Sequence, residues 1–427
     1  MRDLLVLAAL MALVPMAMTS TFVAYLLWCW AGLIGINGYL YGFLQPLPFV
    51  QIFAILTLVL LFAKTDKQQQ KLELTSTGLL YGFFGFQALL VALFAYEGLP
   101  RNWEIFSNIL KTLLFCAVMP MVVNSRVRLH ALLIIIVIGF SFHGILDGLK
   151  FLASAGSHNA RGVAKFGDNN YLALALGTVL PISIFLSRYT KNKWIRWGFV
   201  VTGFLTILAV ISTHSRGGLL TLLAIAAWLI WHSKRKVTGL LGFLVCLVIV
   251  VLMAPDSWTE RMNTIKAVDA DQSFMGRVAV WKKSTAIAVE HPFVGAGFYA
   301  VQSEPVYEKF KDSPGLMGFI QTPDPGVLAA HSIYFQVMGD MGFLGFFIYC
   351  SLFVNLFLTR ARLLKQVRSI GPQLQWAADL ANCLAASALA FLVGGAALSA
   401  AYLEIPFLVI ALMEVTALIV RNYQNQA

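Results

Sequence analysis

One arginine of this sequence lies where arginines are unusual. Arg216 follows Thr213-His214-Ser215 and precedes Gly217-Gly218, in a short turn between two long apolar stretches. Its planar guanidinium suits two parallel hydrogen bonds to a phosphate group, and the two glycines would let a substrate approach the backbone. The alternative is an arginine that extends towards lipid headgroups. We favour phosphate binding, with Ser215 as a further substrate-binding residue.

Two histidines could exchange protons near neutral pH. His331 begins an apolar stretch, and His214 lies two residues before Arg216. A histidine changes charge near pH 6.5 and can take a proton from a hydroxyl group. Each could instead be a polar residue with a structural partner. We predict that His331 is the general base and that His214 binds substrate; His214 is also the main competitor for the base.

Three other polar residues are candidate substrate-binding groups. Arg161 follows Ser157-His158-Asn159-Ala160, and Asn170 belongs to Gly167-Asp168-Asn169-Asn170-Tyr171, which opens an apolar stretch. Arg277 follows Gly276 in a hydrophilic segment and precedes Trp281. Both arginines could instead be ordinary surface charges. All three would join Arg216 and His331 only if distant loops meet in the fold.

The sequence predicts neither a metal site nor a cofactor. HExxH, P-loop and GxSxG patterns are absent. Asp269-Ala270-Asp271 could hold a divalent metal against a diphosphate, but a solvated acidic loop explains it better. Six ionisable residues within apolar stretches are expected to pair between helices rather than to act on a substrate: His143, Asp147, Lys150, Asp379, Glu404 and Glu414.

The composition determines the class of protein. Of 427 residues, 59% are hydrophobic and only 12% are charged, and the mean hydropathy is +0.78. Soluble domains carry about 25% charged residues, so a soluble enzyme is excluded. The five cysteines lie in apolar stretches without metal-ligand spacing. We therefore predict an all-α polytopic membrane protein.

Basic residues predict the orientation of the apolar stretches, because lysines and arginines mark cytoplasmic loops. Every second loop carries a basic cluster, and one long segment, 255–330, is expected outside. The block 4–40 must then cross once, as one long broken helix, which gives about twelve spans with both termini cytoplasmic. The other spans are 47–63, 78–96, 104–123, 130–152, 169–187, 197–213, 216–231, 237–254, 331–358, 375–398 and 402–420.

This topology divides the chain into three regions: membrane helices in 1–254, a periplasmic loop at 255–330, and C-terminal membrane helices in 331–427. The loop is slightly acidic, with seven basic against nine acidic residues. The net charge of +11 therefore belongs mostly to the cytoplasmic face. It indicates orientation and contact with anionic lipid, and we expect no nucleic-acid partner.

Four segments, in this order, resemble the O-antigen ligase superfamily, and the resemblance covers about residues 160–346. They are Asp168-Asn169-Asn170-Tyr171-Leu172 running to Pro181; Ser215-Arg216-Gly217-Gly218; Gly276-Arg277-Val278-Ala279-Val280-Trp281, continuing to His291-Pro292-Phe293-Val294-Gly295-Ala296-Gly297; and His331-Ser332-Ile333-Tyr334 with Gly339-Asp340-Met341-Gly342-Phe343-Leu344-Gly345. The resemblance makes Arg216 and His331 expected site residues.

The resemblance implies transfer of a glycan from undecaprenyl diphosphate to an acceptor on the periplasmic side of the bacterial inner membrane. In O-antigen ligases the acceptor is the lipid A–core oligosaccharide. Many members carry His-Asn where this chain has His331-Ser332. Related O-glycosylation ligases also carry His-Ser. The short length, with no large C-terminal soluble domain, favours a lipopolysaccharide ligase over a protein-glycosylating enzyme.

These residues fit an inverting, metal-free displacement in which arginines stabilise the leaving diphosphate and a histidine deprotonates the acceptor hydroxyl. An O-antigen polymerase and a protein O-glycosylation ligase remain alternatives within this class. A flippase of lipid-linked glycan is the alternative from another class. It would need polar groups through the membrane depth, whereas the strongest polar cluster here belongs to one face.

Overall fold

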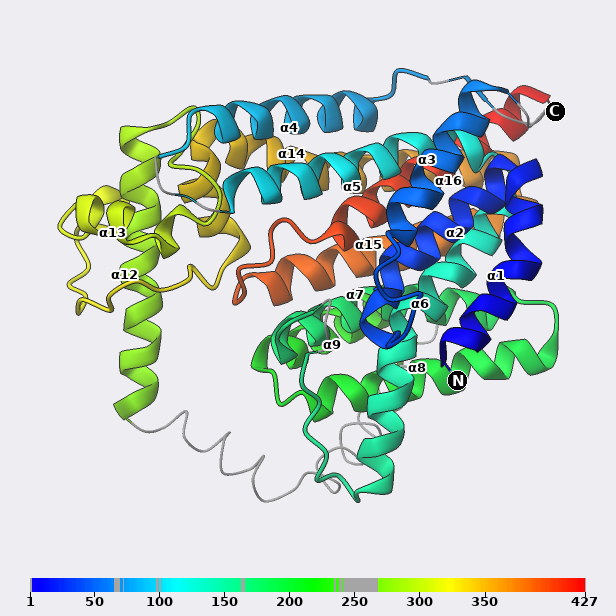
Figure 1. Cartoon of the computed structure of the whole chain (residues 1–427), viewed down its shortest axis with the longest axis horizontal. Coiled ribbons are helices and arrows are strands. Elements are labelled where there is room, and N and C mark those ends of the chain that lie inside the picture. The colour runs from blue at the N-terminus through cyan, green and yellow to red at the C-terminus, as the bar shows by residue number, and fades with distance from the viewer. Residues whose placement is uncertain are drawn as a thin grey trace.

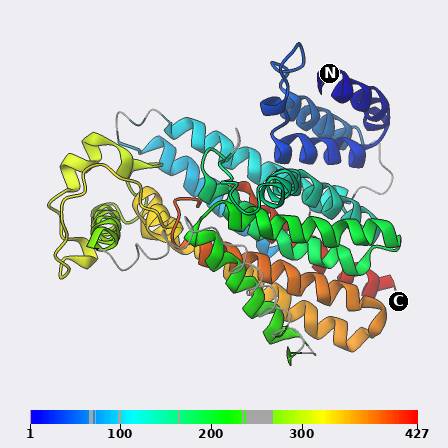
Figure 2. The same cartoon turned by 90° about the horizontal axis from the view of Figure 1, so that it is seen from below.

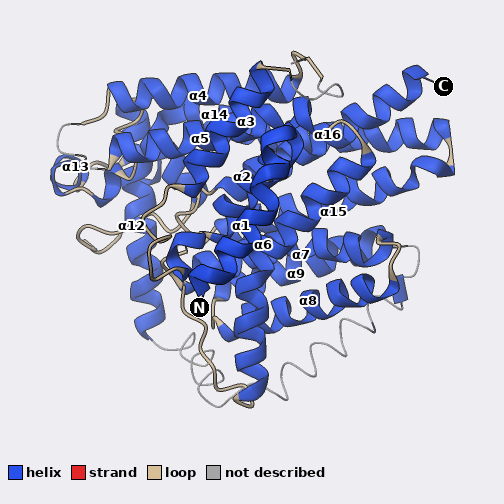
Figure 3. Ribbon diagram, turned by 45° about the vertical axis from the view of Figure 1, so that its right-hand side comes forward, coloured by secondary structure: helices blue, strands red, loops and turns tan. Residues whose placement is uncertain are grey.

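The computed structural model describes residues 2–64, 70–71, 73–96, 99, 101–162, 166–233, 236–237, 241 and 268–426. Within these ranges the chain forms helices and loops without any strand (Figure 3), which confirms the all-α prediction. The longer helices are α1 (Arg2–Thr19), α2 (Thr21–Ile34), α3 (Phe49–Phe62), α4 (Ser76–Leu93), α5 (Asn102–Val122), α6 (Arg126–Ala153), α7 (Asn169–Tyr189), α8 (Lys193–Ser212), α9 (Arg216–His232), α12 (Val268–Glu290), α14 (Ile333–Ile370), α15 (Gln375–Gly395) and α16 (Glu404–Gln426). The short ones are η1 (Ile36–Tyr39), η3 (Ala300–Gln302), α13 (Glu304–Phe310), η4 (Gly315–Met317) and η5 (Pro372–Leu374).

Helix α7 lies at the centre of the bundle. It packs against α6, α8, α9 and α15, and its apolar stretch is 78% buried. Helix α14 packs against α4, α12, α15 and α16 (Figure 1). Helices α1 to α3 pack together at one side, where α2 contacts α6 (Figure 2). Small residues bring α7, α9 and α15 close together, which is how membrane helices gain packing energy without a hydrophobic driving force.

The helices begin at residues that suit their first turns. The side chains of Ser20, Ser125, Asp168, Asn192 and Ser215 each accept a hydrogen bond from an amide near the start of the following helix. Such caps satisfy backbone donors that have no partner within the helix. Polar residues in an otherwise apolar sequence therefore set where many of the helices begin.

Most of the loops predicted to lie outside are tied to one another, whereas the 41–46 loop lies beside the start of α1, away from α12 and α13 (Figures 1 and 2). Four hydrogen bonds join them: Tyr96 N to Ala296 O (3.1 Å), Ala160 N to Ser212 O (2.9 Å), Asn169 Nδ2 to Thr213 O (2.7 Å) and His331 N to Ser399 Oγ (2.8 Å). Basic loops gather at the end of the bundle away from α12 and α13, where the guanidinium of Arg126 lies 5.0 Å from the ring centroid of Trp376. The two sets of loops thus lie at opposite ends, while their placement relative to a membrane stays a prediction.

The N-terminal block forms two helices where one long broken helix was predicted. The chain reverses at Ser20, so α1 and α2 form an antiparallel pair. The carboxylate of Asp3 accepts hydrogen bonds from the amides of Tyr41, Gly42 and Leu44, which brings the two ends of the block together. The prediction that 4–40 forms one long broken helix is wrong, because the capping hydroxyl of Ser20 starts a second helix within the apolar block. How often this block crosses a membrane, and with it the side of the N-terminus, stays a prediction.

Eight described helices are long and apolar enough to cross a membrane, and three shorter ones, α2, α3 and α9, are also apolar. The chain is therefore a multi-pass membrane protein. The predicted span 237–254 lies outside the described residues, apart from residues 237 and 241, and the number of twelve spans stays a prediction.

Several ionisable groups within the helices make structural contacts. Those of Glu414 and of Asp379 with Tyr189 join two helices, as expected, whereas Lys150 pairs within its own helix. Asp147 pairs with Lys150 (3.3 Å) and with His158 (3.1 Å). Glu414 of α16 accepts a hydrogen bond from the hydroxyl of Thr77 in α4 (2.7 Å). Three other contacts are His143 Nδ1 with Tyr39 Oη (2.5 Å), Asp379 with Tyr189 Oη (2.5 Å) and Asp379 with Gln375 Nε2 (2.9 Å). These contacts favour the structural interpretation of the residues involved.

We predict that the end carrying α13 faces the outside of the cell. Asp312 and Lys191 are both exposed, and their loops are predicted to lie on opposite sides of the membrane. In intact cells, Asp312→Cys should react with a membrane-impermeant maleimide, whereas Lys191→Cys should react only after permeabilisation. The unsubstituted chain measures the background from the native cysteines. Labelling of the cysteine at 312 only after permeabilisation would contradict the orientation.

Candidate functional site

A loop after α12 packs main chain against main chain on the first part of α14. Gly342 in α14 has φ 69°, which interrupts the helix, and a Cβ there would lie 2.6 Å from the carbonyl oxygen of Pro292. Only glycine fits such an approach at this φ. Three hydrogen bonds close the junction: Ala296 N to Gly339 O (3.0 Å), Gly297 N to Asp340 O (3.1 Å) and Leu344 N to Pro292 O (3.1 Å). The junction fixes the outer segment relative to the start of α14.

Two contacts hold His331 just before α14. The indole of Trp281 donates a hydrogen bond to the carbonyl of Ala330 (2.7 Å), and its ring stacks on Phe335 with centroids 4.8 Å apart. The amide of His331 donates to Ser399 Oγ (2.8 Å), and its φ of 45° lies in the left-handed region. A non-glycine residue holds this conformation only where its surroundings impose it, which is frequent at functional sites.

Charged groups from two other parts of the chain act on this histidine, and a third acts through Arg277. Burial lowers the pKa of the His331 imidazole below its usual 6.5, Arg277 lowers it further, and Asp168 opposes the shift. Burial and the nearby Arg216 lower the pKa of Arg277 in turn. The structure therefore brings together Arg216 at the start of α9, Arg277 of α12, Asp168 before α7 and His331 before α14. At neutral pH the imidazole is mostly uncharged, which is the form that can accept a proton.

The turn before α9 exposes Arg216 and buries its neighbours. Ser215 is buried, and its hydroxyl accepts a hydrogen bond from the amide of Gly218 (3.1 Å). Arg216 is the first residue of α9, where the positive end of the helix dipole disfavours a cation. In the described part of the chain, neither Arg216 nor Arg277 forms an ion pair with a carboxylate. Two adjacent cations without an acidic partner are suited to an anionic ligand.

Gly218 has a different role from the one expected. A Cβ at Gly218 would lie 2.7 Å from Cβ of Ala173 in α7, so this glycine allows two helices to pack closely. A Cβ at Gly217 would lie 3.5 Å from the carbonyl oxygen of Gly394 in α15, an ordinary contact distance. The prediction that a substrate approaches the backbone is wrong at Gly218, because α7 occupies that space, and it stays a prediction at Gly217. Ser215 likewise acts as the helix cap.

The loop with Arg161 lies against the same turn. The amide of Ala160 donates to Ser212 O, and the side chain of Asn169 donates to Thr213 O. Arg161 is exposed next to this contact, and Asn170 lies in the first turn of α7, partly buried. His214, with φ 53°, belongs to the turn itself. Arg161, Asn170 and His214 thus lie on segments around the turn.

A cavity of about 1130 Å³ opens beside His331. Its polar part is lined by Arg101, Asp168, Tyr171, Gln302, Ser303, Glu304, His331 and Ser399. Its apolar part runs between α2, α5 and α16, along Trp28, Leu33, Phe115 and Leu408. Among the described residues that the sequence singled out as sites, His331 alone lines this cavity. Such a mixed cavity suits an amphiphilic ligand.

The cavity also reveals two cations that the sequence analysis did not identify, Arg101 and Lys111. Arg101 lies just before α5 and Lys111 lies within it, and both line the cavity. Lys111 is a lysine in the middle of a predicted span, and this position was a signal, because ionisable residues within the membrane depth are costly and often functional. Sequence periodicity could not show that α5 borders a cavity.

No group of metal-ligating residues occurs in the described part of the chain. Asp269 and Asp271 lie in the first turn of α12, and their side chains lie outside the described structure. The metal-free prediction therefore rests on the arginine and histidine chemistry, and an experiment must test it.

Comparisons with known proteins divide the chain into two parts. Residues 201–350 match the family described as O-antigen ligase, and residues 1–191 match a family of unknown function. No match was found among curated proteins. Arg216, Arg277 and His331 lie within the first match, whereas Arg101, Lys111 and Asp168 lie within the second.

We predict that His331 titrates below pH 6.5 and that its charged neighbours set the value. The imidazole signals of the purified protein in detergent can be followed by NMR against pH, with His331→Gln identifying the resonance among seven histidines. Arg277→Gln should raise the pKa, since it removes a repelling cation, and Asp168→Asn should lower it, since it removes an attracting anion. Unchanged titration in both variants would show that these groups do not surround His331.

Proposed function

Because the chain belongs, through residues 201–350, to the O-antigen ligase family, we propose that it is a membrane glycosyltransferase. In this proposal it transfers O-antigen glycan from undecaprenyl diphosphate to the lipid A–core oligosaccharide at the periplasmic side of the inner membrane. The observation that carries the proposal is the convergence of His331 with Arg277 and Arg216 at one end of the bundle, beside a cavity that is partly polar and partly apolar. A soluble sugar nucleotide would not require the apolar part.

Arg216 and Arg277 are suited to the leaving group of this reaction. When the bond between the anomeric carbon and the diphosphate oxygen breaks, the diphosphate gains negative charge. Two guanidinium groups fixed nearby stabilise that charge without reorganisation and without a metal ion. Arg216 therefore binds the donor diphosphate, with Arg277 as its neighbour. Arg161, His214, Ser215 and Asn170 remain proposed substrate-binding residues around the same turn, although Ser215 also caps α9.

His331 is suited to the acceptor side. The acceptor hydroxyl attacks the anomeric carbon, its proton passes to the neutral imidazole, and undecaprenyl diphosphate leaves from the opposite face. A direct displacement of this kind inverts the anomeric configuration. The lowered pKa of His331 supports this role, because the base must be unprotonated before attack.

Other acceptors give the alternative functions. With a second lipid-linked glycan as acceptor the same chemistry gives an O-antigen polymerase, and with a protein hydroxyl it gives an O-glycosylation ligase. A flippase of lipid-linked glycan would need no general base. Purified protein supplied with lipid-linked glycan and lipid A–core separates these functions: ligation supports our proposal, chain lengthening indicates a polymerase, and transport without transfer indicates a flippase.

We predict that Arg216→Lys lowers kcat for transfer about 10-fold or more. Lysine keeps the positive charge but loses the planar fork that binds two phosphate oxygens, and hydrogen bonds to charged groups contribute about 1.5–3 kcal/mol. Turnover of radiolabelled lipid-linked glycan by protein in detergent measures the effect. Lys191→Met, which removes an exposed cation at the opposite end of the bundle, is the control. Near-normal turnover by Arg216→Lys would exclude the bidentate role.

We further predict that His331→Ala reduces kcat about 10²- to 10⁴-fold, the typical cost of losing a general base, while donor binding persists. His214→Ala at equal expression is the matched comparison. A loss of activity in His214→Ala together with normal ligation by His331→Ala would assign the base to His214. EDTA should leave the unsubstituted protein active; if EDTA abolishes activity, the metal-free mechanism is wrong, and Asp269 and Asp271 become the first candidate ligands.

A further inference from the structure

Polar residues of α5 form a row along the cavity. Arg101, just before the helix, and Asn108, Lys111 and Thr112 within it all line the cavity. Their spacing places them within one arc of the helix, together with Ile105 and Phe115. Lys111 is the tenth of 21 residues in α5, so it lies near the middle of an apolar helix. A lysine at that depth is costly unless it meets water, protein or an anion.

The two cationic side chains extend towards each other. Nε of Arg101 lies 3.3 Å from the carboxylate of Glu104, which is further into the helix. Nζ of Lys111 lies 3.4 Å from Oδ1 of Asn108, one turn back towards the outer end. Positions 104 and 108 are separated by about 6 Å along the helix axis at 1.5 Å per residue. The two cations therefore border the same stretch of the cavity, and a diphosphate group bound there would compete with Glu104 for its ion pair with Arg101.

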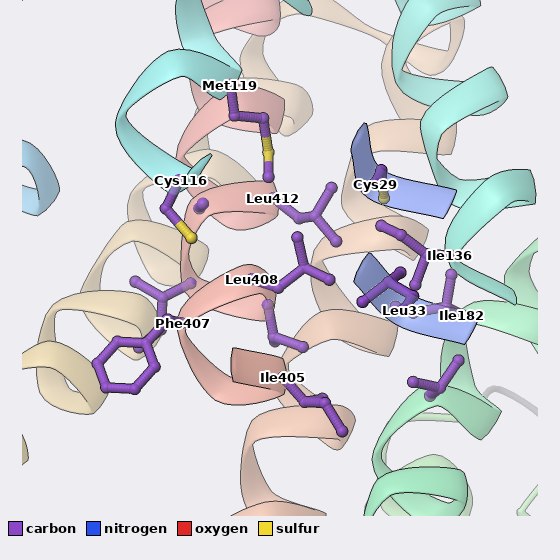
Figure 4. Close-up of a cluster of buried hydrophobic side chains, with 14 of the residues drawn as sticks. Cys29, Leu33, Cys116, Met119, Ile136, Ile182, Ile405, Phe407, Leu408 and Leu412 are labelled. Atoms are coloured by element: carbon purple, nitrogen blue, oxygen red, sulfur yellow. The ribbon is translucent and has the colours of Figure 1, made fainter. Parts of the chain in front are cut away.

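The cation row continues directly into the apolar part of the cavity. Figure 4 shows Leu408 of α16 beside Cys116 of α5, with Cys29 and Leu33 of α2 across from them, and all four line the cavity. Trp28 and Phe115 extend the same apolar surface, and their rings meet edge to face with centroids 5.0 Å apart. The anion site and the hydrocarbon slot are therefore parts of one cavity, and His331 lies on its polar wall.

Resting on the proposed function, we propose that Arg101 and Lys111 form the loading site for the lipid-linked donor. The diphosphate binds between the two cations, and the first isoprene units lie in the slot between α2, α5 and α16. The rest of the polyprenyl chain extends into the membrane. In this arrangement Arg101 and Lys111 hold the diphosphate when the donor enters and so determine donor affinity. For transfer the diphosphate passes to Arg216 and Arg277, which stabilise the charge that develops as the bond to the sugar breaks.

A phospholipid could supply similar chemistry, since its phosphate group also joins a hydrocarbon tail. Two features favour the polyprenyl diphosphate. Two separated cations suit the longer, more highly charged diphosphate better than a single phosphodiester. The cavity also continues to His331, where an attached sugar would meet the base. Competition between the two lipids therefore forms part of the test.

The test measures binding of radiolabelled farnesyl diphosphate, a short prenyl diphosphate, to the full-length protein in detergent. Because affinity depends on the diphosphate and the first isoprene units, this probe should bind. Lys111→Met and Arg101→Gln should each weaken binding about 10- to 100-fold, the usual effect of losing a charge-assisted hydrogen bond, and Lys111→Arg should retain most of it. The matched control is Lys309→Met, which removes a lysine of α13 that does not line the cavity.

Unchanged binding in both Lys111→Met and Arg101→Gln would overturn the loading site. Unlabelled undecaprenyl diphosphate should displace the probe, and phosphatidylglycerol should not; equal displacement would overturn the assignment to the donor and indicate a phospholipid site. Size-exclusion elution identical to the unsubstituted protein confirms that a variant is folded.

Kinetics separate this proposal from the proposed function. If both hold, Lys111→Met raises KM for the lipid-linked donor with little change in kcat, whereas Arg216→Lys lowers kcat. Transfer by Lys111→Met with unchanged KM would refute the loading site alone. Lys111-dependent binding of farnesyl diphosphate without any glycan transfer by the unsubstituted protein would refute the proposed function alone.

Discussion

The main-chain junction between residues 292–297 and α14 is the constraint on which the site depends. Non-helical backbone at the edge of a membrane bundle is stable only where protein satisfies its polar groups, and here the helix that breaks at Gly342 and the loop that meets it satisfy each other. Because α12 leads into this loop and His331 precedes α14, the junction determines how near Arg277 comes to the histidine. The glycine-rich stretches on both sides therefore act through backbone geometry and do not themselves supply a reactive group.

The electrostatic arrangement follows from that placement. Arg277 and burial keep the imidazole of His331 mostly neutral, and Asp168 limits the shift. Arg277, one of the two cations that favour an anionic ligand, thus also keeps the histidine able to accept a proton. The arginines are permanently charged, whereas burial and Arg277 favour the neutral form of His331.

Much of this architecture could be predicted from the sequence, and the failures have physical causes. Long apolar stretches and alternating basic loops indicated the helices and the shared end of Arg216, Arg277 and His331. The reversal at Ser20 was missed because a single hydroxyl, without any charge, separates two apolar helices. Gly218 was misjudged and Lys111 overlooked for one reason: hydropathy gives the length of a helix but not which neighbour each face meets. That information depends on tertiary packing, which periodicity does not encode.

The close packing of α7, α9 and α15 has a consequence for motion. A Cβ added at Gly177 of α7 or at Gly394 of α15 would overlap the side chain of Thr221 in α9, so these three helices pack with no room for larger residues. The part of the cavity wall formed by α2 and α5 is built from larger side chains that can change rotamers. When a bulky amphiphile enters the cavity, α2 and α5 should therefore move more than the closely packed helices α7, α9 and α15.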